Sequence, residues 1–191
     1  MIDAIARLLI GTAAGFLTTA LLARFLMQAA RVPFRNPLGQ FVIAVTDWMV
    51  VPARRVIPSA WGYDSATLLL AIAWQLVKAI VLLLLAGWSA VSPSLYFAVL
   101  LLALANTLEV LLYLIIGVVL VAAVFSWTNP RAPLAQTFDT LTRPWLAPLR
   151  RVIPPVGGID LSPLALIVGI QVVLIMLGGA QGSLLRQIVI G

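Results

Sequence analysis

The sequence predicts an all-α membrane protein: four transmembrane helices forming two parallel repeats, each with an amphipathic interfacial helix. Composition is the first observation, because 63% of the 191 residues are hydrophobic, only 9% are charged and the mean hydropathy is +1.13. Soluble domains average about 25% charged residues. The second is a set of four long apolar runs, and the third is a segment that occurs twice.

The duplication divides the chain. Residues 35–68 match residues 131–164 without a gap, and the clearest part is the string 52–58 (Pro-Ala-Arg-Arg-Val-Ile-Pro), which recurs as 148–154 (Pro-Leu-Arg-Arg-Val-Ile-Pro). A Gly-x-Asp motif follows each string, ending at Asp64 and Asp160. Self-similarity in one register indicates an internal repeat. We therefore expect a first module over 1–92 and a second over 93–191, each with two spans and an amphipathic loop.

In the first module, residues 6–30 are long enough for the roughly 20 residues that a bilayer requires. Arg24 lies near one end of this span, where its side chain is expected to extend to the head groups. Apolar residues then recur with helical, one-sided spacing from Leu38 to Met49, which predicts a helix lying at the membrane surface. Pro52 is expected to end it and to leave the following arginines in an extended segment. Asp64 is placed to cap the next span, residues 65–87.

The second module repeats this pattern. The run over residues 95–127 is too long for the roughly 30 Å bilayer core, and the repeat places its span in the later part. Residues 95–101 are then a tilted extension, a segment kinked near Asn106, or an interfacial segment, and the sequence leaves these alternatives open. A second amphipathic loop follows, and Asp160 is placed to cap the last span, residues 161–179.

Charge sets the expected topology. Eight of the twelve basic residues lie in the two loops. They are Arg31, Arg35, Arg54, Arg55, Arg131, Arg143, Arg150 and Arg151. Positive residues beside apolar spans mark cytoplasmic loops, so we expect a bacterial inner membrane protein with both termini outside. On its own, a net charge of +6 would suggest that the protein binds nucleic acid, but the placement of the basic residues beside apolar spans argues against it.

The chain contains no Cys and no His. Disulfides, thiolate chemistry, imidazole ligands and covalent haem attachment through cysteine are therefore excluded, and no cofactor or metal site is expected. Asp64 and Asp160 are interpreted as helix caps, since no nucleophile and base accompany them. An enzyme is the least supported class of function.

Two sets of charged residues are candidate sites. The pairs Arg54, Arg55 and Arg150, Arg151 are either topology determinants that hold the loops to anionic lipid or a binding site for anionic groups of lipid or partner, because guanidinium groups suit bidentate binding. Lys78 and Glu109, the only Lys and the only Glu, both fall inside spans. Charge within a membrane is costly and is a functional hypothesis by default. We expect a structural ion pair between them, with an ion-conducting element as the alternative.

The repeated unit resembles the YggT family of bacterial and plastid membrane proteins, and the resemblance covers nearly the whole chain. The residues that carry it are Arg24, Pro37, Pro52, Arg54, Arg55, Pro58, Gly62 and Asp64, then Ser126, Trp127, Pro133, Pro148, Arg150, Arg151, Pro154, Gly158 and Asp160. The resemblance implies links to osmotic or salt stress and ion uptake, to cell or plastid division and nucleoid arrangement, or to haem attachment on a chloroplast cytochrome, and no established reaction.

Taken together, these features lead us to expect a non-enzymatic assembly or scaffold factor that presents an arginine-rich cytoplasmic face to anionic lipid or partners. The expected partners are membrane lipids and either a second copy of the chain or another membrane protein. The alternative is an ion or osmolyte pathway, or its accessory subunit, that uses Lys78 and Glu109.

Overall fold

The computed structural model describes residues 1–58, 63–87, 93–154 and 160–190, and within them every regular element is a helix. The order is α1 (Ile2–Ala29), α2 (Pro37–Val56), α3 (Ser65–Leu85), α4 (Pro93–Thr128), α5 (Pro133–Val152) and α6 (Ser162–Ile190). Four of these, α1, α3, α4 and α6, are long and apolar enough to cross a membrane. The prediction of an all-α membrane fold with four spans is confirmed.

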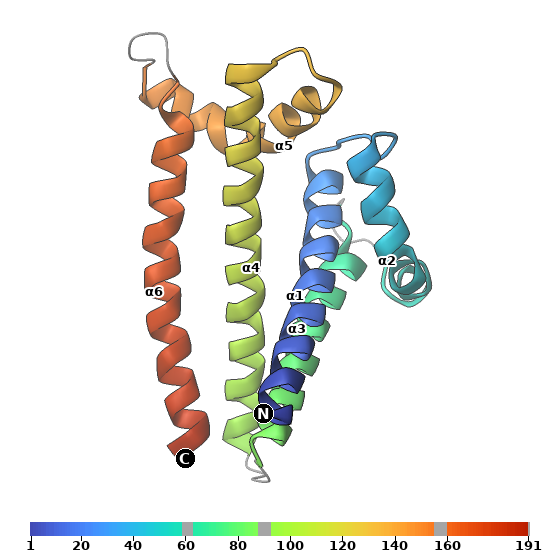
Figure 1. Ribbon diagram of the computed structural model, residues 1–191, viewed down its shortest axis with the longest axis vertical. Coiled ribbons are helices and arrows are strands. Elements are labelled where there is room, and N and C mark those ends of the chain that lie inside the picture. Colours follow the sequence, from blue (N-terminus) through green and yellow to red (C-terminus); the bar gives the residue numbers. More distant parts are fainter. Residues whose placement is uncertain (59–62, 88–92, 155–159, 191) are drawn as a thin grey trace.

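The helices form two modules with the same internal arrangement, α1–α2–α3 and α4–α5–α6. Helices α1 and α4 run in one direction and α3 and α6 in the other, so the repeats are parallel (Figure 1). The shorter helices α2 and α5 lie at one end, and both chain termini lie at the other (Figure 1). We call the first the arginine-rich end, because the eight loop arginines lie on or beside α2 and α5.

Side chains from both modules share one core. Met27 of α1 and Val42 of α2 pack in the same buried cluster as Val119 of α4, Leu141 of α5 and Ile170 of α6. At the arginine-rich end the modules also touch through Asn36, whose side-chain nitrogen donates to Thr137 Oγ1 at 3.5 Å. Burial of apolar surface therefore fixes the two modules against each other.

The amphipathic helices are longer than the sequence suggested. The expectation that Pro52 ends α2 is wrong: the helix continues to Val56, so Arg54 and Arg55 occupy its last turn. A proline inside a helix removes one backbone hydrogen bond and bends the helix without ending it, provided that the later residues stay helical. Helix α5 likewise contains Pro144 and Pro148, and the ribbons of both helices change direction along their length (Figure 1).

The spans also settle the question left open for residues 95–101. They belong to the single helix α4, which spans 36 residues without a break and is about 54 Å long at 1.5 Å per residue. Helix α6 extends to Ile190, beyond the expected end at residue 179. Gly62, Gly158 and residues 88–92 of the uncharged connector lie outside the described residues.

Candidate functional site at the arginine-rich end

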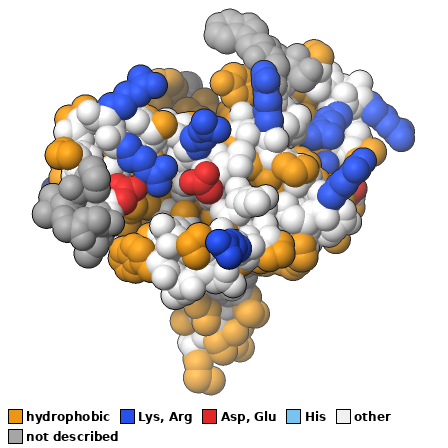
Figure 2. Space-filling view, turned by 90° about the horizontal axis from the view of Figure 1, so that it is seen from above, with side chains coloured by type: hydrophobic (Ala, Val, Ile, Leu, Met, Phe, Trp, Pro, Cys, Tyr) orange, Lys and Arg blue, Asp and Glu red, His pale blue; other side chains and the backbone are white. Residues whose placement is uncertain are grey.

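The arginine-rich end gathers positive charge from both modules. All eight loop arginines are exposed there, and Figure 2 shows Lys and Arg side chains spread over this face with few acidic ones between them. Only Arg54 and Arg150 form ion pairs within the described residues of this set. The face is therefore strongly positive.

In the first module, the arginine motif and the aspartate motif are joined. Arg54 Nη2 contacts Asp64 Oδ2 at 2.5 Å and Arg54 Nε donates to Asp64 Oδ1 at 3.4 Å, while Nη2 also donates to Gln28 Oε1 at 3.1 Å. Asp64 is the N-cap residue of α3 and accepts from both the backbone N–H and the hydroxyl of Thr67. One carboxylate thus connects the end of α2 to the beginning of α3.

The second module repeats this contact in a more open form. Arg150 Nε donates to Asp160 Oδ2 at 2.8 Å, and Asp160 Oδ1 accepts from Ser162 N at 2.9 Å. The Asp64 side chain is only 3% exposed, whereas that of Asp160 is 35% exposed. The first arginine of each pair therefore serves the fold, and the second, Arg55 or Arg151, forms no ion pair among the described residues.

Both aspartates are held in the charged form. Burial alone would raise the pKa of Asp64, but the hydrogen bonds from Arg54 and Thr67 outweigh it and the pKa lies below its ordinary value of 3.8. Burial likewise acts to raise the pKa of Asp160, and the hydrogen bonds from Arg150 and Ser162 again lower it overall. At neutral pH both ion pairs are therefore fully formed.

Arg24 makes a contact that sequence reasoning did not find. Its guanidinium does not extend to the head groups but donates from Nη1 to Thr46 Oγ1 and Asp47 Oδ1, each at 2.7 Å. Arg24 is only 5% exposed, so a charge is held between α1 and α2. The available signal was the acidic Asp47 on the amphipathic helix that follows the span, but only the fold shows which residue it meets.

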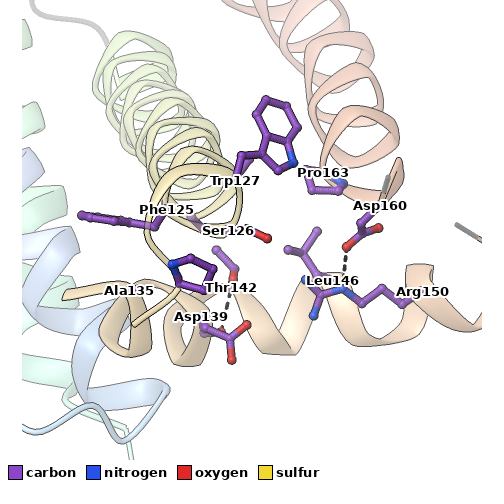
Figure 3. A pocket seen from close by; sticks show the side chains of 13 residues that line it. Phe125, Ser126, Trp127, Ala135, Asp139, Thr142, Leu146, Arg150, Asp160 and Pro163 are labelled. Atoms are coloured by element: carbon purple, nitrogen blue, oxygen red, sulfur yellow. Dashed lines mark hydrogen bonds and ion pairs between the residues drawn. The ribbon is translucent and has the colours of Figure 1, made fainter. Parts of the chain in front are cut away.

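A small cavity lies at the same end of the second module (Figure 3). Its volume is about 160 Å³, and it is bordered by the last turns of α4, the inner side of α5 and the beginning of α6. Its polar lining residues are Ser126, Asp139, Thr142, Arg150 and Asp160. Phe125 and Trp127 contribute aromatic surface.

The intramembrane charges Lys78 and Glu109 do not form the expected direct pair. Within the described part of the chain, no ion pair joins Lys78 to Glu109. Instead Gln181 Nε2 donates to Glu109 Oε2 at 2.8 Å and to Asn106 Oδ1 at 2.9 Å. Lys78 lines a cavity of about 390 Å³ together with Asn106, Gln181 and Arg7. Gln181 of α6 is thus the residue that sequence reasoning missed.

Comparisons with known proteins agree with the repeat. The family model CCB3/YggT matches the chain twice, over residues 3–85 and 101–181. An uncharacterized protein in the proC 3′ region of Vibrio alginolyticus is 37% identical over 181 residues, which covers 94% of this chain and 97% of the relative. The uncharacterized protein YggT of Escherichia coli K12 is 39% identical over 166 residues, covering 86% and 85%. No solved structure matches the chain.

Proposed function

Because the chain belongs to the CCB3/YggT family and folds as a four-span membrane protein, we propose that it is a non-enzymatic assembly or scaffold factor. In this proposal the arginine-rich end is a cytoplasmic face that binds anionic lipid or acidic partners.

The observation that carries the proposal is the excess of exposed arginine at one end. Arg54 and Arg150 are neutralised by aspartates, but Arg55 and Arg151 sit in the last turns of α2 and α5 with no ion-pair partner within the described residues. Cations beside an anionic membrane surface contribute about 1 kcal/mol each. Two equivalent arginines on parallel modules therefore favour one shared anionic surface over two unrelated contacts.

A lipid-retaining purification tests this face. The amount of anionic phospholipid that co-purifies with the full chain is expected to fall severalfold in the double variant Arg55→Ala, Arg151→Ala. Arg7→Ala is the matched control, because Arg7 lies in the first turns of α1, at the opposite end of the molecule. Substitution by Lys is expected to restore binding only in part, since Lys lacks the planar fork. Unchanged lipid in the double alanine variant would contradict the proposal.

The proposed orientation places the arginine-rich end in the cytoplasm of a bacterium and both termini outside the inner membrane. The positive-inside rule supports it. The chain has no natural Cys, so single cysteines report cleanly. Cys at exposed Val56 should be protected from an impermeant maleimide in intact cells, whereas Cys at exposed Ala86 should react. The reverse labelling pattern would overturn the orientation.

A second candidate function is an ion or osmolyte pathway, or an accessory subunit of one. The cavity beside Lys78, Asn106 and Gln181 favours it, because ionisable groups inside spans often mark such pathways. The test is flux of monovalent ions or small osmolytes into proteoliposomes, with Lys78→Met as the variant. A pathway requires flux that this substitution abolishes, and wild-type proteoliposomes as tight as empty ones would exclude the chain as a pathway by itself.

A further inference from the structure

The two modules differ in the hydrogen-bond partner of an equivalent buried threonine, Thr46 in the first and Thr142 in the second. In the first module, the Thr46 hydroxyl of α2 accepts a hydrogen bond from the Arg24 guanidinium. At the equivalent positions of the second module, Thr142 is again buried, but Leu120 replaces Arg24 and is 50% exposed. Within the described part of the chain, Thr142 donates only to backbone carbonyls of its own helix, at 2.9 and 3.2 Å. The first module therefore supplies a cation to this threonine from its own chain, and the second does not.

Smaller side chains open a cavity next to Thr142. Leu26 and Met27 are buried in the core of the first module, and their equivalents are Ala122 and Ala123, which line the cavity. The preceding loop also differs. Gly39 lies so close to the Phe34 backbone that an added Cβ would meet Phe34 Cα at 2.7 Å. The equivalent residues Ala135 and Pro130 border the cavity instead.

The cavity carries the acceptors that a cation requires. Asp47 has no counterpart in the second module, where Arg143 stands, but Asp139 lies one turn earlier on α5 and lines the cavity. Among the described residues Asp139 has no ion-pair partner. The hydroxyls of Ser126 and Thr142 face the same space, with the Arg150–Asp160 pair beyond them (Figure 3). The oxygen acceptors of Asp139, Ser126 and Thr142 thus stand on one side, and the Arg150 guanidinium with its partner Asp160 stands on the other.

Position and size narrow the ligand class. The cavity lies beside the last turns of α4 and the first turn of α6, at the end of the spans, where lipid head groups are expected. Trp127, an aromatic residue of the type enriched at membrane interfaces, borders it. A volume of about 160 Å³ is far larger than the roughly 15 Å³ that one water needs.

We propose that this cavity binds the ethanolammonium head group of a phospholipid in the leaflet at the arginine-rich end. The ammonium lies among Asp139, Ser126 and Thr142, and the phosphate lies toward Arg150. The ligand ammonium then takes the role that the Arg24 guanidinium has in the first module. The chemistry is that of a zwitterion, which distinguishes this site from the exposed arginine face.

Native mass spectrometry of the delipidated full chain tests the assignment by titration with phosphatidylethanolamine, phosphatidylglycerol and soluble phosphoethanolamine. In the background Arg55→Ala, Arg151→Ala, which removes the proposed anionic-lipid face, the protein is expected to bind phosphatidylethanolamine roughly tenfold more tightly than phosphatidylglycerol, because a charge-assisted hydrogen bond is lost without the ammonium. Asp139→Asn removes the charge and Ala123→Met installs the bulkier residue of the first module. Each is expected to abolish the preference.

Arg143→Gln is the matched control, since Arg143 is exposed on α5 and does not line the cavity. It should leave the preference unchanged. The Arg55→Ala, Arg151→Ala background separates this site from the proposed scaffold face, because the exposed arginines no longer bind phosphatidylglycerol there. Equal binding of the two lipids in that background overturns the assignment. Loss of the preference in Ala123→Met but not in Asp139→Asn overturns the role of the ammonium. Competition by soluble phosphoethanolamine at lipid concentrations overturns the lipid as its source.

Discussion

The two modules of this protein share a backbone plan but differ in how their arginine-rich ends are closed. In the first module, Arg24 is buried against Thr46 and Asp47, and the carboxylate of Asp64 is almost fully covered. In the second, a cavity stands beside Thr142 and the Arg150–Asp160 pair is accessible. The contact between the arginine and aspartate motifs is present in both modules, so it is a property of the repeat. The buried Arg24 contact that closes the first module is absent from the second, and we infer that the second module is specialised for contact with molecules outside the chain.

The symmetry is broken a second time at the opposite end of the spans. Lys78, Asn106, Glu109 and Gln181 form a polar group from α3, α4 and α6. Their equivalents in the other module are Leu174, Ile10, Ala13 and Leu85, all apolar. This polar group therefore exists once, where the modules meet, and cannot be a property of the single repeat.

The largest effect is expected from giving the first module a residue of the second. Asp47→Arg places a cation beside the buried Arg24 guanidinium and removes its partner. An unpaired buried charge typically costs about 3–5 kcal/mol, so a comparable loss of the free energy of unfolding in detergent is expected. Arg143→Asp, the reverse exchange at an exposed position, should change stability by less than about 1 kcal/mol.

A double variant sharpens this comparison. Arg24→Leu combined with Asp47→Arg reproduces both residues of the second module and removes the buried charge, so most of the lost stability should return. If the double variant is as unstable as Asp47→Arg alone, repulsion between the two cations is not the cause of the loss.

The next effect separates the two copies of the shared contact. Asp64→Asn keeps a capping side chain but removes the charge that meets Arg54, and hydrogen bonds to charged groups contribute about 1.5–3 kcal/mol. Asp160→Asn breaks a pair whose side chains are 45% and 35% exposed, for which about 0–1 kcal/mol is expected. Thermal unfolding of both variants measures the difference, and equal losses would show that burial does not distinguish the modules.

The pH dependence of stability tests the same two ion pairs independently. Both aspartate pKa values are lowered in the folded protein, so their stabilisation is present above the ordinary pKa of 3.8 and is lost as the pH falls through the lower folded value. Wild-type stability should therefore decline below about pH 4, and Asp64→Asn should flatten that decline more than Asp160→Asn. Identical acid profiles would contradict the assignment.

A smaller effect is expected in the polar group that occurs only once. Because Gln181 donates to Glu109, the double-mutant cycle of Gln181→Leu with Glu109→Gln should show a coupling energy of about 1–2 kcal/mol. The cycle of Lys78→Met with Glu109→Gln should show less, since these two side chains form no ion pair among the described residues. A stronger coupling for Lys78 would restore the direct pair that the sequence suggested.

Local pattern predicted most of the fold, and it did so where the physics is local. Apolar runs defined the four spans, and the duplication gave the parallel modules. Pro52 misled because a missing N–H weakens a helix at one point, whereas the neighbouring hydrogen bonds decide whether the helix continues. The partners of Arg24 and Asp64 depend on how α1, α2 and α3 pack, which no spacing in the sequence encodes.

The last comparison concerns one glutamine at equivalent positions. Gln75 of α3 is fully buried, whereas Gln171 of α6 is exposed on a span. A carboxamide facing hydrocarbon lacks the hydrogen bonds that water would give it, and interhelical hydrogen bonds in membranes contribute about 0.6–2 kcal/mol. We therefore expect a second copy of the chain to pack on α6.

Gln171→Leu should weaken self-association about fivefold, measured by energy transfer between labelled copies in liposomes. Gln75→Leu is the matched control, because its amide atoms have no hydrogen-bond partner among the described residues and face the interior. Association that is unchanged by Gln171→Leu, or weakened as much by Gln75→Leu, would separate the exposed glutamine from the oligomer and leave α6 as a lipid-facing helix.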